Sequence, residues 1–310
     1  MQAIDRNTLT DAVIASFAGA HDPRLKEVLG ALVRHLHAFA REVELRPEEW
    51  RAGIAFLTAA AAITDDRRNE FVLTSDILGL TSLTDLLQSV PGATERSVLG
   101  PFHAEGSPEL AVGGDLIRAN AGQPVLVCGR VLDLAGKPVR GATVDFWQTN
   151  AVGHYWQQDP GQSPDNLRFR MTLGDDGTYA FTTVRPAPYT VPYDGPVGDL
   201  LRAGGRHAWR PAHFHFRVLA DGFAPLTTEL FPADDPYIDQ DAVFGVRASL
   251  AIPFVQCDSP EEAGRYRLPN PFERVEFDFR MSPARCSTGP GRPQLAGPLT
   301  DNGGMCSMAA

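Results

Sequence analysis

Apolar residues in the first hundred positions recur with the spacing of amphipathic helices. Between residues 25 and 36 they stand three and four positions apart, which places them on one helical face. These residues are Leu25, Val28, Leu29, Leu32, Val33 and Leu36. Asp22 and Pro23 precede them in the order of an N-cap and a proline at the first helical position. We expect further helices to begin at Pro47 and to cover residues 83–90.

From about residue 99 the pattern changes to short apolar or alternating runs, separated by turns rich in glycine and proline. The runs cover residues 125–131, 142–147, 179–184, 213–218, 226–231 and 274–279. Many short strands with such turns are typical of a β-sandwich. We therefore expect a mostly β protein, with an α-helical N-terminal region over residues 1–98, a β-sandwich domain over 99–282, and an irregular, partly disordered tail over 283–310.

Charge and cysteine content narrow the class of protein. The formal net charge is -10 and basic residues do not cluster, which argues against a nucleic-acid partner. The N-terminus lacks the pattern of a signal peptide, and no apolar run is long enough to cross a bilayer. Cys128, Cys257, Cys286 and Cys306 are scattered and form no C-x-x-C motif, so we expect reduced thiols and a cytoplasmic protein.

A pair of histidines gives the strongest sign of chemistry. They stand in the segment Arg210-Pro-Ala-His213-Phe-His215-Phe. Residues two apart in a strand project from the same face, so both imidazoles can reach one metal ion. Two ordinary histidines would explain an isolated H-x-H equally well. The apolar surroundings favour the metal, because unpaired imidazoles there would need partners.

Two tyrosines upstream are candidate oxygen ligands. Tyr155 follows Gly-His and Tyr189 follows Pro-Ala-Pro, in segments with the composition of loops. Loops at a sheet edge can converge on a pair of strands. The H-E-x-x-H and H-x-x-E-H zinc motifs are missing from the sequence. Packing of the tyrosines in turns and ligation by distant carboxylates remain alternatives at this point.

Several ordered motifs together resemble the intradiol ring-cleaving dioxygenases, in their catechol and hydroxyquinol 1,2-dioxygenase branch. The motifs cover residues 99–102, 129–131, 144–150, 153–155, 188–189, 194–198 and 210–215. The resemblance includes the helical N-terminal part and omits the C-terminal tail. It implies a homodimer formed through the helical region, with a lipid-like molecule as a further candidate at that interface.

The same resemblance implies a non-haem Fe(III) enzyme that cleaves an aromatic diol or triol with O2, between two hydroxylated carbons. The implied iron ligands are Tyr155, Tyr189, His213 and His215. Tyr189 is then the ligand that the substrate displaces, whereas Tyr179 and Tyr193 are structural. Arg210 is expected to lie at the edge of the strand that carries the two histidines and to stabilise negative charge on the substrate, with a structural ion pair as its alternative role.

The expected substrate depends on one acidic residue in an apolar run. Asp76 can cap a following helix, or it can line the pocket with Leu73 and accept a hydrogen bond from a third ring hydroxyl. The second interpretation favours hydroxyquinol (1,2,4-trihydroxybenzene), converted to 3-hydroxy-cis,cis-muconate, over catechol. The resemblance adds six pocket residues: Val98, Leu99, Gly100, Pro101, Val191 and Pro192. Leu99 stands where hydroxyquinol enzymes often have an aromatic residue.

Glu229 departs from the catechol enzymes, which usually have glutamine at this position. A carboxylate there can orient a group beside the metal or pair with Arg210, and it changes the charge of the site. Two other classes remain as alternatives: a non-catalytic β-sandwich binding protein that has lost the iron, and an extradiol dioxygenase, which would use Fe(II) with two histidines and a carboxylate. The paired tyrosine motifs argue against the extradiol enzyme.

Overall fold

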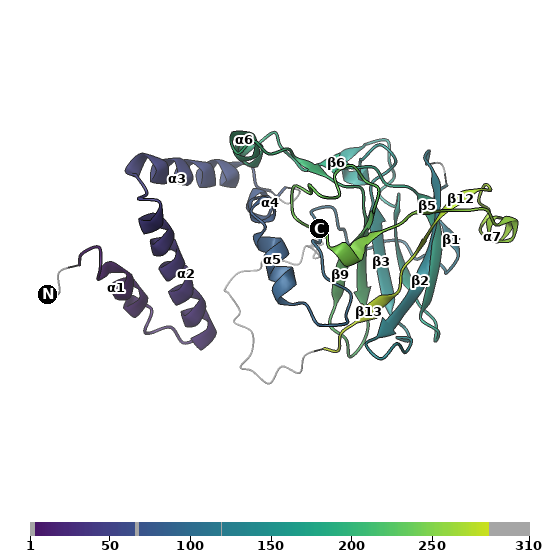
Figure 1. Ribbon diagram of the computed structural model, residues 1–310, viewed down its shortest axis with the longest axis horizontal. Helices are drawn as coiled ribbons and strands as arrows, with labels where there is room; N and C mark the ends of the chain where they lie inside the picture. The colour runs from purple at the N-terminus through teal and green to yellow at the C-terminus, as the bar shows by residue number, and fades with distance from the viewer. Residues whose placement is uncertain (1–3, 66–67, 119, 285–310) are drawn as a thin grey trace, which may run out of the picture. The chain divides into compact units, whose positions relative to one another are not determined.

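The computed structural model describes residues 4–65, 68–118 and 120–284 (Figure 1). The chain divides into two compact units, which comprise residues 4–59 and 60–284 of the described chain, and each is considered by itself. The predicted tail lies outside the described residues apart from positions 283 and 284, and so do Cys286 and Cys306. Cys128 and Cys257 are free thiols.

The unit of residues 4–59 consists of helices. It contains α1 (Leu9–Ser16), α2 (Pro23–Glu42) and most of α3 (Pro47–Ala62). Asp22 caps α2, because its carboxylate accepts hydrogen bonds from the backbone N–H groups of Arg24 and Leu25 at 2.8 and 3.2 Å. Both the cap and the start at Pro47 confirm the predictions.

The second unit contains α4 (Glu70–Ile77), α5 (Leu80–Leu87), α6 (Pro196–Ala203) and α7 (Pro260–Tyr266). Helix α5 begins and ends three residues earlier than the helix predicted over 83–90. Helix α4 was not predicted, because its apolar residues have no helical period. Asp76 lies in the last turn of α4, so its interpretation as an N-cap was wrong. Gly79 holds that position for α5, at a φ of 73° that glycine adopts without strain.

Two mixed sheets form much of the rest of this unit. Each predicted run falls on strands of these sheets, but the strands at 114–115, 168–172, 251–252 and 255–257 were not predicted. One sheet has the order β1-β5-β2-β12-β11, with β13 also paired to β2. Its strands are β1 (Gly114–Asp115), β2 (Pro124–Asp133), β5 (Thr178–Val184), β11 (Val255–Cys257), β12 (Phe272–Glu276) and β13 (Phe279–Met281). The run predicted over 274–279 is therefore divided between two strands.

The other sheet has the order β10-β9-β8-β3-β4. Its strands are β3 (Thr143–Gln148), β4 (Arg168–Thr172), β8 (Phe214–Leu219), β9 (Leu226–Pro232) and β10 (Ala251–Ile252). A separate two-stranded ribbon joins β6 (Tyr189–Thr190) to β7 (Trp209–Arg210). Arg210 therefore lies in β7, and the prediction that it shares the strand of the two histidines was wrong.

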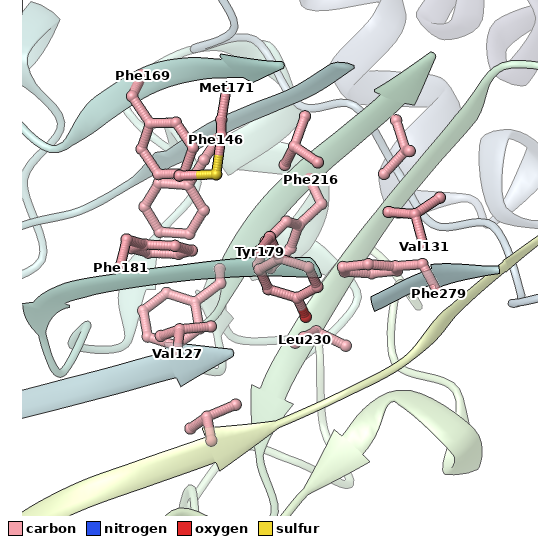
Figure 2. Packing of buried hydrophobic residues seen from close by; sticks show 14 of the residues in the cluster. Val127, Val131, Phe146, Phe169, Met171, Tyr179, Phe181, Phe216, Leu230 and Phe279 are labelled. Atoms are coloured by element: carbon pink, nitrogen blue, oxygen red, sulfur yellow. The ribbon is translucent and has the colours of Figure 1, made fainter. Parts of the chain in front are cut away.

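Aromatic side chains from both sheets pack into one core (Figure 2). Phe146 of β3 meets Phe181 of β5 with ring centroids 4.7 Å apart, and Phe216 of β8 meets Phe279 of β13 at 4.8 Å. Tyr179 is fully buried there, and its hydroxyl donates to the carbonyl of Phe277. The structure thus combines mixed sheets with an N-terminal helical region. Among the described helices none is long and apolar enough to cross a membrane.

The alternation of side chains along β8 separates this core from the candidate site. Phe214 and Phe216 belong to the core, whereas His215 between them points to the opposite face of the sheet, as the period of a strand requires. Glu229 stands directly opposite His215 on the neighbouring strand β9. One face of the same two strands therefore forms the core, and the other presents polar side chains.

Candidate metal centre

His213 and His215 converge as their spacing predicts. His213 directly precedes β8, and the two Nε2 atoms lie 3.1 Å apart, with both residues buried. The Nδ1 atom of His213 lies 2.7 Å from the carbonyl oxygen of Pro211. A carbonyl only accepts, so Nδ1 carries the proton and Nε2 presents a lone pair, with Nη1 of Arg210 at 3.3 Å. Burial lowers the pKa of His213 to about 4 and that of His215 well below its usual value, so both rings are neutral at pH 7.

Tyr155 reaches the histidines from the segment after β3. It precedes a short 3₁₀ turn at Trp156–Gln158, and its backbone N–H donates to the side chain of Gln158. Its phenol oxygen lies 3.0 Å from Nε2 of His215 and 3.4 Å from Nε2 of His213. The ring of Phe102 stacks on the Tyr155 ring with centroids 4.3 Å apart, which fixes its orientation.

Tyr189 arrives through the β6–β7 ribbon, in which it pairs with Arg210. Its ring packs edge to face against the ring of Tyr155, with centroids 5.4 Å apart. The centroid of the His213 ring lies 5.5 Å from that of Tyr189. Burial raises the pKa of both phenols, and the positive charge of Arg210 partly opposes the rise for Tyr189. Without a cation beside them, both tyrosines therefore keep their protons.

Arg210 is buried between two carboxylates. Its Nη1 and Nη2 atoms donate to Glu229 at 2.8 and 3.0 Å, and its Nε and Nη2 atoms donate to Asp241 at 3.0 and 3.1 Å. Ser97 also donates its hydroxyl to Glu229, at 2.5 Å. The ion pair that the sequence allowed for Arg210, and the pairing suggested for Glu229, are both present.

Opposing effects set the charge of Glu229. Burial is the largest single effect and favours the neutral acid, but it is outweighed by the charge of Arg210, the two histidines and the hydrogen bonds from Arg210 taken together. The pKa of Glu229 consequently falls to about 2. The pKa of Arg210 is raised well above its usual value, because Asp241 and Glu229 outweigh the effect of burial. With one cation and two anions, this buried network has a net charge of about -1 at pH 7.

The imidazole of His215 packs against Trp147 and against the backbone of Gly100. Trp147 stacks on it with ring centroids 4.7 Å apart and an interplanar angle of 8°. On another side, Gly100 has a φ of 70°, and a Cβ atom there would lie 3.3 Å from Cε1 of His215. The Nδ1 atom of His215 is 3.5 Å from a carboxylate oxygen of Glu229. This Nδ1 atom has no hydrogen-bond partner among the described residues, so the stacked ring of Trp147 is the contact that orients the imidazole.

The donor atoms fit a transition metal. His213, His215 and Glu229 offer ligand atoms that all lie within 4.8 Å of one another. The oxygens of Glu229, however, already accept hydrogen bonds from Arg210 and Ser97. Two neutral imidazoles and the phenol of Tyr155 present the remaining atoms. Because imidazole suits transition metals and deprotonated phenols are hard anionic donors, the set suits iron.

The predicted substrate residues have different surroundings. Asp76 and Leu73 are buried on α4. Among the described residues, Oδ1 of Asp76 finds no hydrogen-bond partner, and burial raises the pKa of this carboxyl. The charges of Arg210, Glu229 and Asp241 also act on it, which places it near the network. Of the other predicted residues, Val98 and Val191 are buried, Gly100 and Pro192 are partly buried, and Leu99 and Pro101 are exposed.

Comparison with known proteins agrees with this geometry. The family model described as "Dioxygenase" matches residues 104–283, and "Catechol dioxygenase N terminus" matches residues 22–94. A 6-chlorohydroxyquinol 1,2-dioxygenase of Cupriavidus pinatubonensis is 47% identical over 91% of this chain and 99% of its own length. The chain belongs to the intradiol ring-cleavage dioxygenase family. A hydroxyquinol 1,2-dioxygenase of Rhizobium is 44% identical over 88% of this chain and 94% of its own length.

Solved structures place this intradiol dioxygenase in the same fold. The hydroxyquinol 1,2-dioxygenase of Pseudomonas putida DLL-E4 has a TM-score of 0.83 and 44% identity, over 90% of this chain and 99% of that one. The catechol 1,2-dioxygenase of Acinetobacter radioresistens has a TM-score of 0.76 and 27% identity, over 94% and 99%. Family members of both kinds thus share the architecture described above.

Sequence reasoning missed several residues that shape the site of this intradiol dioxygenase. Asp241 and Ser97 complete the contacts of Arg210 and Glu229, and Phe102 and Trp147 orient two candidate ligands. Phe102 and Trp147 lie within motifs that carried the family resemblance, so a signal existed for them. No motif in the sequence pointed to Asp241, because a single acidic residue in a turn resembles any surface aspartate.

Proposed function

We propose that this enzyme cleaves hydroxyquinol with O2, between adjacent hydroxylated carbons, to 3-hydroxy-cis,cis-muconate. The assignment of the substrate rests on Oδ1 of Asp76, which is buried and has no hydrogen-bond partner among the described residues. A buried acceptor without a partner is costly, and the third hydroxyl of a triol would donate to it. Catechol has no hydroxyl for this purpose. Relatives named as hydroxyquinol 1,2-dioxygenases support the assignment.

The proposed cofactor is Fe(III), held by Tyr155, Tyr189, His213 and His215. When bound, the ion supplies Lewis acidity and the positive charge that stabilises two phenolates. The neutral imidazoles need no deprotonation, whereas both phenols must lose protons that burial otherwise retains. Iron binding should therefore release protons and produce the visible absorption of tyrosinate coordinated to ferric iron.

Two residues are proposed to act on the substrate. The phenol oxygen of Tyr189 would leave its ligand position and take up a proton from a substrate hydroxyl. Arg210 is the partner of Tyr189 in the β6–β7 ribbon, and its guanidinium would stabilise negative charge on the ring oxygens. Glu229 and Asp241 fix that guanidinium, so its orientation is set before substrate binds.

Oxygen uptake tests the proposed function. Iron-loaded protein is assayed with hydroxyquinol, catechol and pyrogallol side by side, and the product spectra identify the bond that is cleaved. We expect the highest kcat/KM with hydroxyquinol and cleavage between the hydroxyls. A higher value with catechol would assign the catechol alternative. Iron-loaded protein that is colourless and takes up no oxygen would favour the non-catalytic binding protein.

A tyrosine series tests the proposed ligands independently of turnover. Tyr155→Phe and Tyr189→Phe should each weaken and shift the visible absorption of the iron-loaded protein. Tyr179→Phe is the matched control, because Tyr179 is equally buried but donates to a backbone carbonyl in the core. An unchanged spectrum in either ligand variant would remove that tyrosine from the ligand set.

The helical unit is proposed to form a homodimer, and the two sheets a β-sandwich that carries the catalytic residues over 99–282. The apolar face of α2 supports the dimer, since Val28, Leu32, Leu36 and Phe39 are each about half exposed. Light scattering would report the oligomeric state. We expect Leu32→Glu to give a monomer, because a charge cannot be buried in an apolar interface. Bound lipid would be sought by mass spectrometry of the same samples.

A further inference from the structure

Arg206 connects two segments that are far apart in the sequence. Its Nη1 atom donates to the carbonyl of Ile77, and its Nη2 atom donates to the carbonyl of Ala242 at 2.8 Å. Each carbonyl belongs to the residue that directly follows a buried acid. Ile77 follows Asp76, and Ala242 follows Asp241, which binds Arg210. One guanidinium thus spans the backbone beside the two acids.

Hydrogen bonds to other segments hold helix α4 near both of its ends. At its start the carboxylate of Glu70, which is fully buried, accepts a hydrogen bond from the backbone N–H of Val197 in α6 at 3.0 Å. At its end the carbonyl of Ile77 accepts from Arg206. The backbone of Arg206 is held in turn by a 2.8 Å hydrogen bond from its N–H to the carbonyl of Leu201 in α6. The last turn of α4 therefore depends on Arg206.

The second segment is the turn of residues 241–245. The carboxylate of Asp241 accepts hydrogen bonds from the backbone N–H groups of Val243 and Gly245, at 3.2 and 2.8 Å, and also holds Arg210. The turn and the guanidinium of Arg210 consequently share one carboxylate. Because Arg206 binds the carbonyl of Ala242, it acts on the position of this carboxylate.

Phe244 reinforces the connection. Its φ of 57° is unfavourable for a residue with a side chain, so surrounding contacts must maintain it. The guanidinium of Arg206 lies 4.8 Å from the centroid of its ring. The carbonyl of Phe244 accepts a hydrogen bond from the hydroxyl of Ser82 in α5 at 2.7 Å. The turn is thereby joined to the helices that follow Asp76 in the chain.

We propose that Arg206 is a positioning residue that fixes Asp76 relative to Arg210, and that it thereby sets the selectivity between triol and diol rings. This inference rests on the proposed function, in which Asp76 accepts the third hydroxyl. The binding of hydroxyquinol then depends on the distance between the carboxylate of Asp76 and the guanidinium of Arg210. Catechol has no third hydroxyl and would contact only the group on the side of Arg210. A displacement of about 1 Å in such a contact can cost roughly 100-fold in rate.

Two variants of Arg206 and one matched control test the inference. Arg206→Met removes both donors, and Arg206→Lys keeps the charge but cannot reach both carbonyls at once. Arg202→Met is the control, because Arg202 also belongs to the α6 region but binds Asp199 and the carbonyl of Tyr193. We expect Arg206→Met to lower kcat/KM about tenfold for hydroxyquinol and less than about threefold for catechol, mainly through KM.

Arg206→Lys should lie between the wild type and Arg206→Met, and Arg202→Met should leave the ratio of the two substrates unchanged. A parallel loss for both substrates, or no loss, would overturn the inference. Hydrogen exchange supplies a measurement that needs no substrate: Arg206→Met should speed exchange at residues 76–79 and 242–245, and Arg202→Met should not. Unchanged exchange would overturn the bracing by Arg206 even if wild-type enzyme prefers hydroxyquinol.

The failure of the proposed function would look different. Wild-type enzyme that prefers catechol would remove hydroxyquinol as the substrate before any variant is compared. The selectivity role of Arg206 would be overturned with it. The exchange experiment would still decide whether Arg206 braces α4 and the turn.

Discussion

Strand β9 and helix α4 each bury a carboxylate near the metal centre, but their surroundings are opposite. Glu229 on β9 accepts hydrogen bonds from Arg210 and Ser97, and its pKa falls to about 2. Asp76 on α4 has an oxygen without a partner among the described residues, and burial raises its pKa. The field of Arg210 acts on both. Both oxygens of Glu229 are therefore paired, whereas Oδ1 of Asp76 is unpaired within the described residues.

The difference follows from where the two elements lie. Strand β9 is an inner strand between β8 and β10, so neighbouring segments surround its side chains. Arg210 of β7 and Ser97, from two separate segments, donate to both oxygens of Glu229. Asp76 lies in the last turn of an eight-residue helix. A hydrogen bond from the side chain of Thr81 acts on its carboxyl, but Oδ1 has no partner among the described residues.

The largest effect is expected from breaking the ion network. Arg210→Met leaves Glu229 and Asp241 as buried charges without their cation. Removal of one partner of a buried ion pair costs about 3–5 kcal/mol, and we expect the free energy of unfolding to fall by this amount in chemical denaturation. Arg168→Met is a control, since Arg168 is also buried but donates to carbonyls and a hydroxyl. An equal loss in both variants would contradict the ionic explanation.

Glu229→Gln is a milder change at the same network. It keeps the shape but replaces charged hydrogen bonds, which are worth about 1.5–3 kcal/mol each. We expect a loss of stability in this range, retained iron and visible absorption, and a changed substrate preference or pH profile. Glu273→Gln is the control, because Glu273 is buried and paired with Arg185 in the other sheet. Identical kinetics across pH would show that Glu229 does not influence the reaction.

Asp76→Asn should have the opposite effect on stability. Removal of the buried charge is expected to raise the free energy of unfolding by about 1 kcal/mol. The kcat/KM for hydroxyquinol should fall about tenfold, while that for catechol stays within about twofold, because only the triol uses this acceptor. Asp145→Asn is the control: Asp145 is also buried with a raised pKa, but it lies on β3. A change of substrate ratio in both variants would count against a specific role of Asp76.

The smallest expected effect is the pH dependence of that stability gain. The pKa of Asp76 is raised in the folded protein, so its charged form is disfavoured there and destabilises the fold at pH values above the raised pKa. As the pH falls through that pKa, wild-type Asp76 takes up a proton and the penalty disappears. The advantage of Asp76→Asn should therefore shrink towards acid pH in thermal unfolding of metal-free protein. An advantage that grows towards acid pH would contradict the sign.

Much of the fold follows from patterns that act locally. Asp22 and Pro23 specify the start of α2, because a cap needs only neighbouring residues. The longer strands β2, β3, β5, β8 and β9 were found from short runs between turns, whereas β1, β4, β10 and β11 were not predicted. Helix α4 was missed, since its apolar residues show no helical period. Its buried residues include Glu70, whose carboxylate accepts a hydrogen bond from the distant backbone N–H of Val197 as well as from nearby Arg68.

The sequence by itself determined that His213 and His215 share a face, because the period of a strand is fixed by backbone geometry. The family motifs added Tyr155 and Tyr189, which spacing alone left open. Only the tertiary structure decided that the segments of Tyr155, of Tyr189 and of the two histidines meet, and that Asp241 shares Arg210 with Glu229. Such contacts join residues 60 positions apart, as between Tyr155 and His215, and 132 positions apart, as between Ser97 and Glu229. The local sequence does not encode their meeting, because it depends on how the strands and loops pack.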